Sequence, residues 1–131
     1  MNTTRLIAAI ALLAFANVAQ ADDPDCNPGS DAVLQSFASE EITVSTTAKI
    51  LTAATYAPTG AQRASLAFMT ISGAAARARF DGIAPTTEVG HVIADGSGIK
   101  VCTVDIAKFQ IIRDDAVDVE LSVTYYRPPN Q

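Results

Sequence analysis

The clearest pattern in the chain is a strict alternation of apolar and polar residues over residues 117–125. A period of two is typical of a β-strand that buries one face and exposes the other. Pro128 and Pro129 follow, and neither can donate a hydrogen bond to a neighbouring strand, so the strand is predicted to end before them. The residues predicted to face the core are Val117, Val119, Leu121, Val123 and Tyr125.

Shorter strand-like segments recur upstream, separated by turn residues. Residues 65–71 are apolar on both faces, which favours a central strand. The pair Asp81-Gly82 is typical of a tight turn, and the glycine-rich Asp95–Gly98 precedes a strand, so it is predicted to be a hairpin turn rather than a phosphate-binding loop. The strands predicted before the last one cover residues 41–51, 65–71, 76–80, 91–94, 99–104 and 106–113.

These segments predict an all-β fold with about seven strands at spacings of roughly 8–14 residues. The expected architecture is a single antiparallel β-sandwich, immunoglobulin-like or jelly-roll-like, with a half-open barrel as the alternative. We assign the sandwich to residues 41–127 and a short tail to residues 128–131.

The N-terminal segment, residues 1–21, has a composition of its own. A polar start with Arg5 precedes an apolar run over Leu6–Phe15 and the small-residue step Ala19-Gln20-Ala21. This order predicts a signal-like helix, a secretory signal peptide cleaved after Ala21. A retained membrane anchor is the alternative, but the apolar run is shorter than the ~20 residues that a spanning helix needs.

Residues 22–40 are predicted to form an acidic, extended lead-in to the sandwich. Pro24, Pro28 and Gly29 oppose a helix at its start. Further on, apolar residues at helical spacing predict one short helical turn over Asp31–Ser39. The apolar residues concerned are Val33, Leu34 and Phe37.

Charge and composition restrict the class of partner. The 131 residues are 49% apolar, which suits one domain with a core of its own. Fourteen acidic side chains against 9 basic ones give a net charge of −5. Nucleic acids and anionic membranes are bound by clustered Lys and Arg, so neither is predicted as a partner.

The two cysteines, Cys26 and Cys102, are predicted to form a disulfide. In an exported protein an even number of cysteines favours disulfide formation. A disulfide that closes so long a loop would stabilise the fold by ~4 kcal/mol in the chain-entropy account. Cys26 lies in a polar stretch where a free thiol has no packing role. Two separate buried thiols are the alternative.

No set of residues predicts catalysis, a metal site or a cofactor, and we expect no enzymatic activity. His91 is the one histidine, and a zinc site or a catalytic base would need partners that no motif supplies. The pairs Glu40-Glu41 and Asp114-Asp115 are adjacent in sequence, and neighbours in a strand point to opposite faces. His91 is therefore interpreted as a partly exposed strand residue.

Arg77 and Arg79 are the most informative charges. They share one face of a predicted strand in an acidic chain. Such a pair can clamp a carboxylate or lie in a subunit interface. The alternative is a solvated face on which the arginines pair with acids of the next strand.

The stretch from Arg77 to His91 reads R-A-R-F-D-G-I-A-P-T-T-E-V-G-H. A glycine turn, an I-x-x-F segment at Ile106 and a closing V-x-L-x-V-x-Y strand follow it. Over about residues 75–126 the chain resembles small β-sandwich virion proteins of tailed bacteriophages, which decorate capsids or associate with heads and tails. The resemblance implies a scaffold motif without chemistry of its own.

The resemblance suggests a non-enzymatic structural or decoration protein of a phage virion, working through protein–protein contacts as a homo-oligomer. The leader and the cysteine pair depart from that family, because virions assemble in the cytoplasm. They favour the alternative, an exported periplasmic or cell-surface β-sandwich module for binding or adhesion. The expected location is accordingly the virion, or the periplasm or cell exterior.

Overall fold

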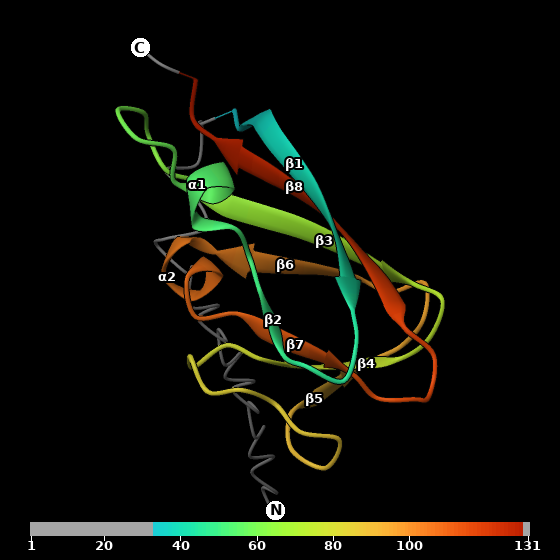
Figure 1. Cartoon of the computed structure of the whole chain (residues 1–131). Coiled ribbons are helices and arrows are strands. Elements are labelled where there is room, and N and C mark those ends of the chain that lie inside the picture. Colours follow the sequence, from blue (N-terminus) through green and yellow to red (C-terminus); the bar gives the residue numbers. More distant parts are fainter. Residues whose placement is uncertain (1–32, 130–131) are drawn as a thin grey trace, which may run out of the picture.

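The structure is a computed structural model that describes residues 33–129, and this part of the chain is built mainly of antiparallel strands (Figure 1). The first of two four-stranded sheets has the order β1-β8-β3-β6. Its strands are β1 (Gln35–Val44), β8 (Val119–Arg127), β3 (Leu66–Ser72) and β6 (Gly98–Cys102).

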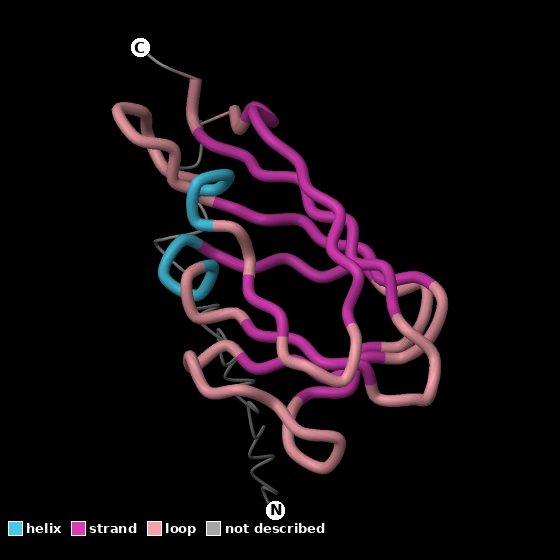
Figure 2. Tube along the Cα trace, viewed as in Figure 1, coloured by secondary structure: helices cyan, strands magenta, loops and turns pink. Residues whose placement is uncertain are grey.

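The second sheet has the order β2-β7-β4-β5. Two short helices connect the sheets and lie at the same end of the molecule (Figure 2). The strands are β2 (Lys49–Ile50), β7 (Gln110–Arg113), β4 (Ala76–Arg79) and β5 (His91–Ile93), and the helices are α1 (Ala53–Tyr56) and α2 (Thr103–Ile106).

The strands pair in a nested order. β4 pairs with β5, β3 with β6, β2 with β7 and β1 with β8. Within residues 33–129, every connection between consecutive strands except β4 to β5 passes from one sheet to the other. The loop between β4 and β5 is thus the tip of one long antiparallel ribbon that is folded into two sheets.

The inner faces of the two sheets share one hydrophobic core. On β8 the side chains of Val119, Leu121, Val123 and Tyr125 are no more than 1% exposed. Burying an aliphatic or aromatic side chain of this size contributes about 1.5–3 kcal/mol each. The second sheet closes the same core with Ala76, Ala78, Ile93 and Ile111. Two antiparallel sheets around one core confirm the all-β, sandwich-like architecture that the alternation predicted.

The alternation of the last strand is confirmed, and β8 ends at Arg127, directly before the two prolines. The central strand predicted over residues 65–71 is present one position later, as β3 (Leu66–Ser72), which lies between β8 and β6. Two details were wrong. Val117 is 58% exposed in the turn before β8, and the second face of β3 is not buried, since Phe68 is 37% exposed.

The helical turn predicted over Asp31–Ser39 was wrong where the structure describes it. β1 begins at Gln35 and pairs with the end of β8, so the sheet begins before residue 41. A β-bulge between Ser36 and Ala38 shifts the register there. A bulge inserts one extra residue and breaks the period of two, and Phe37 and Ala38, which are neighbours in sequence, both pack against the core.

Two further assignments also need correction. The turn Asp95–Gly98 is not a hairpin turn, because β5 belongs to the second sheet and β6 to the first. The backbone there bonds to β3 instead, with the N–H of Gly96 donating to the carbonyl of Ile71 over 2.8 Å. Residues 103–106, predicted to end one strand and begin the next, form α2 instead.

The predicted signal peptide (residues 1–21), most of the lead-in (22–32) and Cys26 lie outside the described residues. The cleavage site and the Cys26–Cys102 bridge therefore stay predictions. In the part that the structure describes, none of the helices has the length and hydropathy required to cross a membrane.

Candidate functional site

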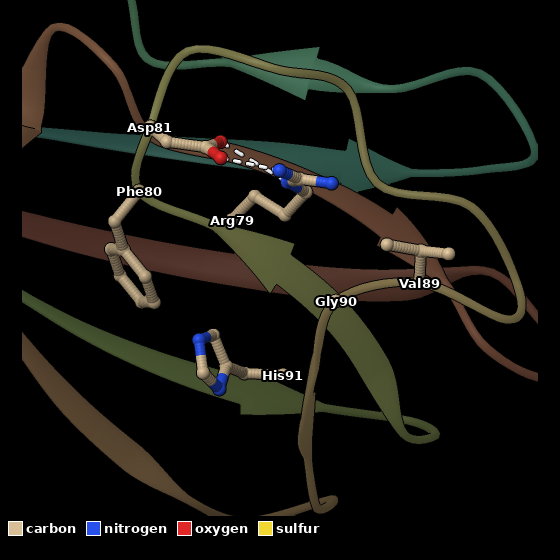
Figure 3. A pocket seen from close by; sticks show the side chains of 6 residues that line it. All are labelled: Arg79, Phe80, Asp81, Val89, Gly90 and His91. Carbon is tan, nitrogen blue, oxygen red and sulfur yellow. Dashed lines mark hydrogen bonds and ion pairs between the residues drawn. The ribbon is translucent and has the colours of Figure 1, made fainter.

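The stretch Arg77–His91 folds into β4, the long loop at the tip of the ribbon, and the start of β5. A shallow hollow of about 510 Å³ lies against it. Figure 3 shows the Arg79–Asp81 pair and Val89 along one side of this hollow and the rings of Phe80 and His91 along the other. This hollow and its rim are the candidate functional site.

Arg77 ties this segment to the rest of the second sheet. It lies opposite the buried Ala76 and Ala78, so its side chain is on the outer face of β4. Its Nε donates to Oδ1 of Asp114 over 2.5 Å, and a terminal nitrogen donates to the carbonyl of Gly90 over 3.5 Å. One guanidinium therefore joins β4, the end of the loop and the turn after β7.

Arg79 is paired with Asp81 at the mouth of the hollow. Its Nε donates to Oδ1 over 3.1 Å, and a second nitrogen contacts Oδ2, so the pair is bidentate. Oδ1 also accepts the backbone N–H of Ile83 over 3.1 Å, which fixes the start of the loop. The hydrogen bonds from Arg79, followed by the one from Ile83, lower the pKa of Asp81 to about 2.

The loop returns close to the backbone of β4 at Gly90. Gly90 has φ +138°, and a Cβ there would lie 3.1 Å from the carbonyl oxygen of Ala78 and 3.2 Å from Pro85. Pro85 is buried, and the side chain of Gln110 donates to the carbonyl of Gly82 over 2.7 Å. The contacts of these residues hold the loop against the sheet.

The aromatic side of the hollow is continuous with the core. The ring centroid of Phe80 lies 5.6 Å from that of the buried Phe109 and 5.9 Å from the imidazole of His91. His91 is an exposed residue of β5, and this agrees with its interpretation as a partly exposed strand residue. The contact with Phe80 gives it a packing role, which no pattern in the sequence indicated.

Three exposed apolar residues of the loop and of β5, which we call the rim, accompany the hollow, and one of them, Val89, lines it. Ile83 is 57% exposed, Val89 49% and Val92 56%. Val92 lies on β5, which is an edge strand of the second sheet among residues 33–129, so that its outer backbone edge pairs with no other strand of this part of the chain. Apolar side chains beside an open strand edge are suited to contact with another protein surface.

The two arginines predicted as a possible interface do lie near this rim. The structure gives each of them a carboxylate partner in its own chain, Asp114 for Arg77 and Asp81 for Arg79. The acids lie in the turn after β7 and in the loop after β4, not on the next strand, and the two arginine side chains are only 22% and 24% exposed. A role for either arginine in contact with another subunit stays a prediction.

A second polar cluster was not found from the sequence. Glu40 is on the inner side of the edge strand β1, in register with Val123. Its Oε1 accepts the hydroxyl of Tyr125 and the N–H of Thr52, the latter over 3.1 Å. Burial, and then the hydrogen bond to Glu40, raise the pKa of Tyr125 far above its ordinary value of 10.0.

Within residues 33–129, no group of three or more His, Cys, Asp and Glu side chains is placed to hold a metal ion. Cys102, the described member of the predicted disulfide, ends β6. Comparisons with models of protein families, with curated proteins and with solved structures found no match to this chain.

Proposed function

We propose that this protein is a non-enzymatic structural or decoration protein of a phage virion, and that its domain is a jelly roll. The strand order carries the proposal. Two four-stranded sheets with the orders β1-β8-β3-β6 and β2-β7-β4-β5 are what results when a nested antiparallel ribbon is rolled up. Jelly rolls are frequent in capsid proteins, although lectins and cupins also use them, so the fold alone does not decide the function.

The local structure of Arg77–His91 supports the proposal independently. The residues that carry the resemblance to virion proteins make contacts that build a loop: an ion pair across strands, a carboxylate that caps the turn, and a glycine at a close approach. These are the contacts of a scaffold. The exposed rim formed by Ile83, Val89 and Val92 supplies the contact surface, either for other virion proteins or for a second copy.

The test of location is mass spectrometry of the protein from its native source. Purified phage particles should contain the chain in fixed stoichiometry to the major capsid protein, and the intact mass should show where it begins. Absence from particles, together with a chain in the periplasm or medium that begins at Asp22, would overturn the proposal. That result would support the exported binding module, which the Ala19-Gln20-Ala21 step favours.

The test of the contact surface uses the two edges of one sheet. Val92→Lys on β5 should abolish self-association or binding to particles without lowering the thermal midpoint of unfolding, because an edge lysine opposes strand pairing. Ile50→Lys is the matched control, since Ile50 is 64% exposed on β2 at the opposite edge. Equal behaviour of the two variants would remove β5 as the contact surface.

A further inference from the structure

The outer face of the β1-β8-β3-β6 sheet carries an apolar patch. Leu66 pairs in register with Tyr126 on one side and with Cys102 on the other, so the three residues form one row across the sheet. Their chain neighbours Ala67, Tyr125 and Val101 are buried on the inner face, which places the row on the outer face. Phe68, two positions after Leu66 and 37% exposed, extends the patch along β3.

The row has a defined beginning and end. Tyr126 pairs in register with Ser36 of β1, so the row runs from Cys102 on one edge strand to Ser36 on the other. The chain that precedes β1 therefore enters the sheet at one end of the row, and a cysteine stands at the other end.

The length of chain before β1 is sufficient to cross the row. Neighbouring strands lie about 4.8 Å apart, so the three steps from β6 to β1 span roughly 14 Å. Cys26 precedes Ser36 by ten positions, and an extended chain advances about 3.3 Å per residue, which gives a reach of roughly 33 Å. Cys26 can thus reach Cys102 while the residues between them pass over the patch.

The charges at the far end of the row are complementary. Lys100 is exposed on β6, two positions before Cys102 and hence on the same face. Asp25 precedes Cys26 directly, and Asp22 and Asp23 lie just before it. Joining Cys26 to Cys102 brings this acidic stretch next to Lys100.

We propose that residues 22–32 cross the outer face of the β1-β8-β3-β6 sheet, held by a disulfide between Cys26 and Cys102, and cover Leu66, Phe68 and Tyr126. The two thiols form the S–S bond and give up two electrons and two protons to a thiol–disulfide oxidant such as glutathione disulfide, which is reduced to two thiols. The proposal requires an oxidised Cys pair and does not depend on a role in virions.

The experiment uses the chain that begins at Asp22, folded in a glutathione redox buffer. Non-reducing peptide mapping should find a single bridge, Cys26 to Cys102, within one chain. Hydroxyl-radical footprinting should then show that Phe68 and Tyr126 are modified severalfold faster in Cys26→Ser than in the oxidised wild type. Phe109 and Tyr125, both 0% exposed, are the internal controls and should not change.

A second measurement does not depend on the folding of Cys26→Ser. The photo-crosslinking residue p-benzoylphenylalanine in place of Phe68 should link to a peptide within residues 22–32 of the same chain, whereas the same residue in place of Ile50 should not. Three results would overturn the proposal. They are two freely alkylated thiols, a bridge that joins two chains, or crosslinking from position 68 that never reaches residues 22–32.

Discussion

Nε of Arg77 lies 2.5 Å from Oδ1 of Asp114, and this ion pair fastens the strand β4 to the turn that follows β7. The two side chains are only 22% and 20% exposed. The backbone supports the same junction, because the N–H of Asp114 donates to the carbonyl of Ala75 over 3.1 Å. The contact therefore combines partial burial with charge, and its loss should be measurable.

Asp114→Asn should lower the free energy of unfolding by about 1–2 kcal/mol, because a charge-assisted hydrogen bond is weakened and Arg77 keeps a partly buried charge. Urea denaturation measures the change. Asp115→Asn is the matched control, since Asp115 is the exposed neighbour and should change stability by less than about 0.5 kcal/mol. Equal effects of the two substitutions would contradict a structural role for the pair.

Gly90→Ala should destabilise the domain by about 1–3 kcal/mol, because the residue has a positive φ and the new Cβ would meet the carbonyl oxygen of Ala78 at 3.1 Å. Gly60→Ala separates the two causes. Gly60 has φ +76°, but a Cβ added there would have nothing within 4 Å, so its substitution adds backbone strain without a steric contact. We expect a smaller loss at Gly60, and a loss as large as that at Gly90 would refute the close approach.

The buried phenol of Tyr125 predicts a loss of stability in alkali. Its pKa is raised in the folded state by burial and by Glu40, whereas in the unfolded chain it ionises near 10.0. A raised folded-state pKa gives stability that is fully present below the unfolded pKa and is lost as the pH rises above it. The loss approaches about 1.4 kcal/mol per pH unit for one proton.

Urea midpoints at pH 8 and at pH 11 test this dependence. Tyr125→Phe should flatten it, because the ionising group is gone. Glu40→Gln should change the dependence much less than Tyr125→Phe, because burial, the largest cause of the raised pKa, stays in place. A slope in Tyr125→Phe equal to that of the wild type would show that other groups govern alkaline unfolding.

Asp81 predicts a separate titration at low pH. NMR detection of its carboxyl carbon should give a pKa of about 2, and Arg79→Gln should move it toward the ordinary value of 3.8, because the largest cause of the shift is the hydrogen bond from Arg79. Asp81 keeps the N–H of Ile83 as a donor, so the return should be incomplete. An unchanged value in Arg79→Gln would place the cause elsewhere.

Alternation predicted the parts of the fold in which one face is buried over several residues. β8 is the best case, because its four inner residues belong to one continuous core. Alternation is interrupted by a bulge at Phe37, where a helical turn was predicted instead, and at Val117 the pattern extends beyond the strand into the turn before it. Alternation also carries no information on which sheet a strand joins, so the turn Asp95–Gly98 was assigned to the wrong kind of connection.

Of the candidate site, the sequence predicted that Arg77 and Arg79 share one strand face, and it did not predict the hollow beside them. The positions of Arg77 and Arg79 on one strand face follow from the period of two. The partner of Arg77 does not, because Asp114 is 37 positions away and reaches Arg77 through the pairing of β4 with β7. Glu40 was missed for a similar reason, since its partner Tyr125 is 85 positions away.

The nested pairing of strands has a consequence for the order of folding. The loop at the tip joins β4 and β5 locally, whereas the next pairs, β3–β6, β2–β7 and β1–β8, each close a longer stretch of chain. Closing longer loops costs more entropy, and pairings distant in sequence slow folding. Pairing is thus expected to begin at Arg77–His91 and proceed outward, and β1, although synthesised before the other strands, finds its partner only when β8 is complete.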